Sequence, residues 1–464
     1  MARLWQSGYE LNTATAGVEF TSTGDSPTVQ SATVRSGTYA GQINGLTSGV
    51  EKYFRYNFQS GDADGPFFVR FYFRADTLPS AENTIFELVS GSDVARCQIR
   101  ITSTGALRLY DGTGQIGSDS SALSTSTWYR LEVRFDASGA VGNDELRARI
   151  NGTEFAGSNT RTLAGGVNGA KFGGNLNAET QTTANWFFDD IAINNSSGSS
   201  QNSYPGTGAI IHLKPNAEGD NTGWSNDWQS VDETTPDDNT TKTVAVVNNT
   251  TDDHNLEASG LTGVDSINVV AVGARFRAAS AVSPASFVLR VKASAGGTVE
   301  ESSSVAPTTT SWATNAVSAP RNYSLVLYDL PGVSAAVWTS ADLDAAQIGY
   351  RIDSVAAVNN DEMSTVWMSV DYTAGGATTT STSSTSSSTS SSTSVSTSTS
   401  TTQSITTSTS STSSSISISV STSTSASTST SSTSSSTSTT TLLEVNIVHQ
   451  PVVYMGVTNI LPGL

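Results

Sequence analysis

The first 196 residues repeat short runs in which apolar and polar positions alternate. In the run from 67 to 74, one set of alternate side chains is wholly apolar, while the other set includes two arginines. A period of two places successive side chains on opposite faces of a strand, so these runs predict antiparallel sheets with one buried and one solvated face. The runs at 131–135 and 146–150 show the same pattern, and turn sequences rich in Gly and Asp separate them. We therefore expect residues 1–196 to form an all-β sandwich.

A second β-sandwich is predicted for residues 208–374, after a linker rich in Ser, Gly and Asn at 197–207. Within it, the pattern favours one short helix at 340–347, with Ser340 as its N-cap and Asp342 in its first turn. Elsewhere the apolar positions alternate, which predicts strands at 267–271, 287–291, 323–327 and 364–372.

Residues 375–441 consist almost entirely of Ser and Thr and contain no charged side chain. Such a segment cannot bury enough apolar surface to offset the entropy lost on ordering, so we expect an extended stalk that acts as a flexible tether and is open to O-glycosylation. An alternative stays open, because Ile416, Ile418 and Val420 alternate with Ser. That pattern is typical of strands, which would pair with copies of the same segment or lie on a neighbour.

The chain turns apolar again at residues 442–464. A short apolar β peptide beyond a long tether suits an anchor, which could add a strand to the open sheet edge of a partner. Folding back onto the chain's own domains is the alternative. We assign the anchoring contacts to Leu442, Leu443, Val445, Ile447, Val448, Val452, Val453 and Tyr454.

The composition excludes several classes of partner. The formal net charge is -18, so the surface repels nucleic acids and anionic lipid headgroups. No run of about 18 apolar residues occurs, so we expect no membrane insertion. The N-terminus has no basic segment followed by an apolar one, and we therefore expect no signal peptide, assembly in a cytoplasm and release by lysis.

Cysteine and histidine are too sparse for common site chemistries. Cys97 is the single cysteine, so no intramolecular disulfide can form, and its alternating neighbourhood predicts an apolar core position on a strand. The three histidines are His212, His254 and His449, and their wide spacing offers little material for a zinc site or a Ser-His-Asp triad.

The strongest enzyme hypothesis is a glycoside hydrolase, which needs two carboxylates across one cleft. The sequence has no Glu-x-Asp-x-x-Glu strand, and Glu132 alternates with Arg130 and Arg134 on a face that we expect to be solvated. We therefore predict that the protein is not an enzyme and has no catalytic residues.

Two acidic motifs remain as candidate ion sites. Asp189 and Asp190 are adjacent on a strand, so we expect their side chains to point to opposite faces, with one accepting hydrogen bonds from backbone or Arg rather than holding calcium. Asp62 and Asp64, in an Asp-Ala-Asp-Gly turn, have the better shape for a calcium loop. Calcium is the only cofactor that the sequence leaves open.

Several separate segments resemble, in order, a family of phage and prophage proteins. The closing stretch at 186–196, with Pro205-Gly206 beyond it, and the stretch at 128–133 resemble strands of concanavalin A-like (laminin G-like) jelly rolls in that family. Its second domain is similar to the stretches at 213–220 with Trp224, 231–238, 338–343 and 347–349. The resemblance covers about residues 1–372 and implies a jelly roll followed by a second β domain.

The same resemblance implies a location more than an activity. Its members are mostly virion or tail-region structural proteins, and some jelly rolls of this fold bind carbohydrate. Glycan binding needs an exposed aromatic ring beside amide and carboxylate groups, and the outward-facing Tyr72 and Tyr110 with Asp111 are our candidates.

We therefore predict a structural protein on the virion surface of a tailed phage, as a fibre, spike or capsid decoration. Its partners would be other virion proteins, further copies of itself (a trimer is one arrangement) and a host-surface glycan. The alternatives are a prokaryotic cell-surface adhesin and a secreted glycoside hydrolase.

Overall fold

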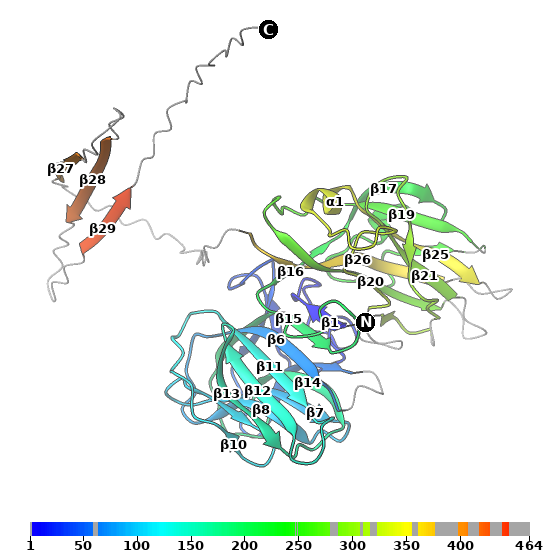
Figure 1. The fold of residues 1–464 in the computed structure, drawn as a ribbon. Helices are drawn as coiled ribbons and strands as arrows, with labels where there is room; N and C mark the ends of the chain where they lie inside the picture. Colours follow the sequence, from blue (N-terminus) through cyan, green and yellow to red (C-terminus); the bar gives the residue numbers. More distant parts are fainter. Residues whose placement is uncertain are drawn as a thin grey trace, which may run out of the picture. The chain divides into compact units, whose positions relative to one another are not determined.

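A computed structural model was analysed. It describes residues 2–58, 64–245, 247, 249–278, 286–306, 310–315, 323–354, 361–375, 398–406, 417–426 and 439–444. The chain divides into two compact units, Met1–Ser384 and Thr385–Leu464. The first unit contains two β-sandwiches, so the predicted all-β class is confirmed (Figure 1).

The first sandwich consists of two antiparallel sheets. The eight-stranded sheet has the order β13 (Thr153–Arg161), β12 (Asp144–Ile150), β11 (Tyr129–Asp136), β6 (Phe67–Ala75), β15 (Asn185–Asn195), β4 (Ala40–Asn44) and β3 (Thr28–Gln30), with β1 (Arg3–Ser7) also pairing with β15. The seven-stranded sheet has the order β10 (Gln115–Ile116), β9 (Leu107–Tyr110), β8 (Ala95–Ile101), β7 (Asn83–Ser90), β14 (Val167–Gly174), β5 (Lys52–Asn57) and β2 (Ser22–Gly24). The alternating runs at 67–74, 131–135 and 146–150 all lie in strands, as predicted.

Aromatic side chains fill the space between these two sheets. The Phe71 ring lies 5.1 Å from that of Phe86 and 5.3 Å from that of Phe172, which brings both sheets together. Trp5 stacks on Tyr56 at 4.6 Å. Cys97 is fully buried in this core, which confirms its predicted position.

The second sandwich also has two sheets. One contains β16 (Ala209–Leu213), β26 (Asp361–Thr373), β20 (Ser266–Ala278) and β23 (Ala313–Thr314), with β18 (Thr243–Ala245) on β26 and β24 (Leu325–Leu327) on β20. The five-stranded sheet has the order β17 (Pro215–Thr222), β19 (Thr251–Leu256), β25 (Gln347–Ser354), β21 (Ser286–Lys292) and β22 (Glu300–Glu301). The predicted strand at 364–372 lies in β26, and its inward residues Val366, Met368 and Val370 are fully buried.

The predicted helix is present as α1 (Ser340–Ala345), and a 3-10 turn, η1 (Trp228–Ser230), precedes β18. The N-cap is Thr339 rather than Ser340, so that prediction was wrong by one residue. The Thr339 hydroxyl accepts a hydrogen bond from the Asp342 N–H, and the Asp342 carboxylate accepts one from the Thr339 N–H, which forms a capping box. No helix among the residues described in the structure is long and apolar enough to cross a membrane.

The outer face of the eight-stranded sheet differs from the predicted solvated face. Arg70, Tyr72 and Glu132 point outward but are almost fully buried. The segment at 197–207 lies on this face: the Gly206 N–H donates to Glu132 Oε1 at 3.0 Å, and the Tyr204 ring packs 5.3 Å from Phe68. The alternation was read correctly, but the pattern alone cannot indicate that another part of the chain covers the polar face.

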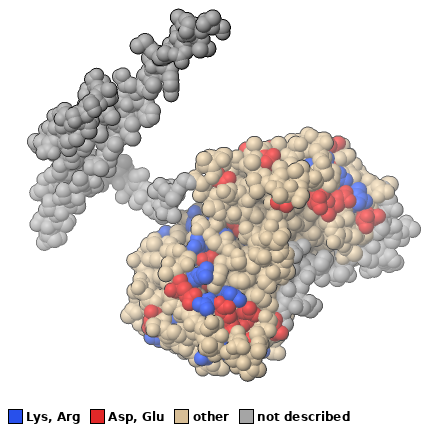
Figure 2. All heavy atoms as spheres, viewed as in Figure 1, with Lys and Arg blue, Asp and Glu red and all other residues tan. Residues whose placement is uncertain are grey.

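Acidic and basic side chains lie next to one another on the face of the first sandwich that Figure 2 shows. On the outer side of β11 to β13, Arg134 pairs with Glu145 at 2.8 Å and Arg147 pairs with Glu154 at 2.9 Å. Charges paired in this way give mixed signs rather than a continuous basic stripe for a nucleic-acid backbone.

The second unit contains a three-stranded antiparallel sheet of β27 (Ser398–Thr406), β28 (Ser417–Ala426) and β29 (Thr439–Glu444). Ile405 pairs with Ile418, and Thr422 pairs with Leu443. The strand alternative for the Ser/Thr segment therefore occurs within one chain. Leu442 and Leu443 lie in β29, whereas the other predicted anchor residues, Val445, Ile447, Val448, Val452, Val453 and Tyr454, lie outside the described residues.

Candidate functional site

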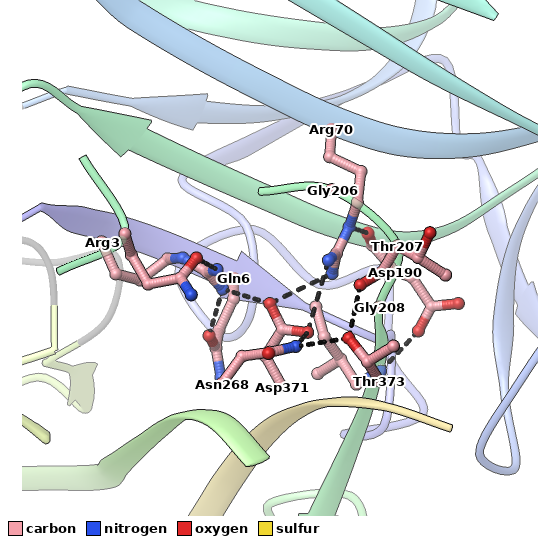
Figure 3. A network of polar contacts seen from close by, with 12 residues as sticks. Arg3, Gln6, Arg70, Asp190, Gly206, Thr207, Gly208, Asn268, Asp371 and Thr373 are labelled. Atoms are coloured by element: carbon pink, nitrogen blue, oxygen red, sulfur yellow. Dashed lines mark hydrogen bonds and ion pairs between the residues drawn. The ribbon is translucent and has the colours of Figure 1, made fainter. Parts of the chain in front are cut away.

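A buried polar network joins the two sandwiches (Figure 3). Asp371 on β26 accepts Arg3 Nη1 at 2.8 Å and Arg70 Nη2 at 3.3 Å, and all three side chains are fully buried. Nearby, the Gln6 amide donates to the Ser369 hydroxyl at 2.9 Å. Burial raises the pKa of the Asp371 carboxyl, but the two guanidinium groups outweigh this effect, so its pKa lies below the ordinary value.

The Asp189-Asp190 pair also belongs to this joint, and the structure corrects our prediction for it. A β-bulge follows Asp189, and Asp190 has a φ of 49°, so the strand does not alternate regularly here. The Asp189 carboxylate accepts the Arg35 N–H at 2.9 Å. Asp190 pairs with the Arg35 guanidinium and accepts the Ile210 N–H at 2.6 Å. Both carboxylates are therefore structural acceptors, not just one of them.

The joint uses one outer face from each sandwich. Trp367 and Tyr323 of the second sandwich are buried against the core of the first, and the Tyr323 hydroxyl lies 3.4 Å from the Gln6 carbonyl. The faces engaged are those of the eight-stranded sheet and of the sheet that contains β26. The outer faces of the seven-stranded and five-stranded sheets take no part in these contacts.

A row of polar side chains crosses the outer face of the seven-stranded sheet. Strand pairing places one residue from each of the seven strands directly opposite the next, and opposite residues share a face. Neighbouring strands lie about 4.8 Å apart, so the row is roughly 29 Å long. In order it contains Ser22, Arg55, Lys171, Glu87, Gln98, Tyr110 and Gln115.

The three central residues of the row are held rigidly. Lys171, Glu87 and Gln98 are at most 2% exposed. The Gln98 amide donates to Glu87 Oε1 at 2.5 Å, and Lys171 Nζ lies 2.6 Å from Glu51 Oε2. Burial raises the pKa of the Glu87 carboxyl to about 8, against the opposing effects of the Gln98 hydrogen bond and the Lys171 charge. Glu87 therefore holds a proton at neutral pH.

Each flank of the row presents a tyrosine and an arginine that are partly exposed. On one side the Arg100 guanidinium lies 3.8 Å from the centre of the Tyr110 ring and donates to Gln98 Oε1 at 3.1 Å. Glu82 accepts both Arg100 at 3.0 Å and the Tyr110 hydroxyl at 3.3 Å.

The other flank repeats this composition. Lys171 Nζ lies 4.7 Å from the centre of the Tyr53 ring, and Arg55 pairs with Asp93 at 2.5 Å. Donors and acceptors thus alternate around two aromatic rings, which is the arrangement that sugar hydroxyls can bridge because each both donates and accepts. We take this surface, the seven-residue row with Tyr53, Glu82, Asp93 and Arg100, as the candidate functional site and call it the row face.

The structure separates the three predicted glycan-binding residues. Tyr110 lies on the row face. Tyr72 lies on the covered face of the other sheet, where it is 6% exposed beneath Arg35, so its predicted role was wrong. Asp111 pairs with Arg161 of β13 and accepts the Thr113 and Gly114 N–H groups, which makes it a turn and sheet-to-sheet contact. Burial raises the pKa of Asp111, but these partners outweigh it and the pKa is lowered.

The predicted calcium loop gains no support. Asp62 lies outside the described residues, and Asp64 is exposed and accepts the Gly166 N–H at 3.0 Å. Across the part of the chain that the structure describes, no group of three or more His, Cys, Asp or Glu could hold a metal ion.

Sequence reasoning missed most of the row. The signal was present in the alternation of Gln98 and Arg100 with apolar neighbours, and of Arg108 and Tyr110 on the following run. Lys171 and Glu87 lie far apart in sequence, and only the strand order β7-β14-β5 brings them together.

Comparisons with known proteins leave the family open. No family model matches the sequence, and no curated protein matches it. Among solved structures, a cellulose-induced protein, Cip1, is 14% identical, with a TM-score of 0.31 over 40% of this chain and 95% of its own. The alginate lyase AlgAT5 from Polysaccharide Lyase family 7 is 11% identical, with a TM-score of 0.27 over 37% of this chain and 83% of its own.

A Trypanosoma rangeli sialidase is likewise 11% identical, with a TM-score of 0.28 over 42% of this chain, and the match spans only 30% of the sialidase. Likeness at this level carries no argument about function. The all-β class stands on the strands of the chain itself.

Proposed function

We propose that the protein is a non-enzymatic, saccharide-binding surface protein whose row face contacts a polysaccharide. The observation that carries the proposal is the in-register row, which takes one polar residue from every strand of the sheet and has Tyr110 and Tyr53 on its flanks. Rigid amide, carboxyl and cationic groups at its centre hold the partly exposed side chains in place.

The charge balance of the row face favours an uncharged glycan. Arg55 faces Asp93, while Arg100 faces Glu82, so neither sign dominates. Binding assays on immobilised neutral and acidic polysaccharides test this, and we expect the neutral polymers to be retained. Retention of acidic polymers alone would contradict the proposal.

The setting that we propose is the virion surface of a tailed phage, and the resemblance across residues 1–372 supports it. Mass spectrometry of purified particles tests the location, together with attachment of a chain truncated after Tyr372. We expect full-length protein on particles and loss of attachment in the truncation, because the proposed anchor lies at 442–464. Equal attachment of the truncated chain would show that the sandwiches dock instead.

A glycan-cleaving enzyme is the second candidate, and one observation favours it. Glu87 has a pKa of about 8, and such a protonated carboxyl can act as a general acid near neutral pH. We expect no new reducing ends when the protein is incubated with polysaccharide. Release that disappears in Glu87→Gln would replace the binding proposal with a hydrolase.

A further inference from the structure

A cavity of about 460 Å³ opens beside the joint between the sandwiches. Two chain segments that are far apart in sequence form its walls. Ser199 and Ser200 come from the segment that follows β15, whereas Tyr328 and Asp329 follow β24 and Glu300 comes from β22. The cavity is therefore complete only while the second sandwich stays docked on the first.

The joint itself holds one wall of the cavity in place. The Tyr328 hydroxyl accepts the Arg3 N–H at 2.8 Å, and the Arg3 side chain pairs with the buried Asp371. Arg3 Nη2 also reaches Gln201 Oε1 at 3.4 Å, next to the two lining serines. A ligand in the cavity would thus contact both sides of a joint that is already rigid.

The chemistry of the lining is acidic and rich in hydroxyl groups. Glu300 and Asp329 are the only ionisable side chains of the lining besides Tyr328, and no Lys or Arg is among the described lining residues. The serine hydroxyls can bridge to sugar hydroxyls, and Leu330 and Val333 offer apolar contact. Two carboxylates without a nearby basic partner in the lining favour a ligand that carries positive charge.

We propose that this cavity is a second saccharide site, distinct from the row face, which takes a sugar unit with a free amino group. The ammonium group would lie between the carboxylates of Glu300 and Asp329, and the ring hydroxyls would face the serines. This site does not depend on the proposed function, because its charge, residues and position all differ from those of the row face.

Titration calorimetry on the full chain tests the proposal with two matched probes, the trimer of glucosamine and the trimer of N-acetylglucosamine. At about pH 6 the free amine is protonated, whereas the acetamide is neutral. We expect the amine form to bind about tenfold more tightly, since one charge-assisted contact is lost on acetylation. Affinity for the amine form should fall as salt rises.

Variants place the binding in the cavity. Glu300→Gln should weaken binding of the glucosamine trimer by about tenfold. Val333→Trp should abolish binding by filling the cavity, while Val264→Trp, the same change at an exposed valine outside the lining, should leave it intact. Tyr110→Ala, on the row face, should also leave it intact. Equal affinity for both trimers, no binding of either, or binding that survives Val333→Trp would each overturn the proposal.

Discussion

Asp371 is the residue on which the contact between the two sandwiches depends most. It is fully buried and faces two buried guanidinium groups, Arg3 and Arg70. A buried ion pair often adds little net stability, but removal of one partner leaves buried charge without compensation. Here the loss of a single carboxylate would leave two such cations.

We expect Asp371→Ala to lower the free energy of unfolding by about 3–5 kcal/mol. Urea denaturation followed by tryptophan fluorescence measures the change. The control is Asp353→Ala, which removes an exposed partner 3.5 Å from Arg351 and should cost less than about 1 kcal/mol. Similar losses in the two variants would mean that the joint contributes nothing to stability.

Glu10 makes the stability depend on pH. Burial raises the pKa of its carboxyl from 4.5 to about 8, although it accepts the Thr38 and Tyr39 N–H groups. The native state therefore binds this proton more tightly than the unfolded chain does. The stabilisation is fully present below the unfolded pKa and is lost as the pH rises through 8.

The prediction for Glu10 is a fall in the free energy of unfolding between about pH 5 and pH 9. Burial also raises the pKa of Glu19, to about 7, which adds to the fall. Glu10→Gln keeps an acceptor oxygen but has no charge, so the slope with pH should become shallower. An unchanged slope, measured by urea titration at each pH, would contradict the assignment to Glu10.

At the scale of elements, sequence patterns predicted the strands and α1 well, because alternation and capping residues act locally. The errors arose where distant segments meet. Tyr72 was read as a solvated side chain, but Arg35 and the joint cover it. The direction of Asp190 was misjudged because a β-bulge, which no periodicity reveals, interrupts β15. Long-range strand order likewise hid most of the row face.

The N-cap of α1 offers a matched test of local structure. Thr339→Ala removes both side-chain hydrogen bonds of the capping box and should cost about 1 kcal/mol. Ser340→Ala, one residue later, should change the free energy of unfolding by only a few tenths of that amount. The reverse ranking would restore Ser340 as the cap.

At the scale of the whole molecule, the two sandwiches of the first unit share one continuous set of buried contacts. Tyr323 and Trp367 belong to the core cluster of the first sandwich although they come from the second. The segment at 197–207 is likewise packed along the covered face rather than spanning open solvent. We expect these elements to unfold together.

Hydrogen exchange measured by mass spectrometry tests this cooperativity. Amides of β15 and β26 should lose protection at the same rate under conditions that favour global opening, since each depends on the joint. Exchange of β26 well before β15 would show that the second sandwich opens by itself.

The central claim is that the row face binds a saccharide, and one measurement tests it most directly. The full chain, Arg100→Ala and Arg147→Ala are compared for retention on immobilised neutral polysaccharides. Both arginines are ion-paired on an outer face, but Arg147 lies on the other sheet. We predict that Arg100→Ala weakens retention about tenfold and that Arg147→Ala retains full binding. Equal retention by all three proteins, or no retention of the full chain, would contradict the account.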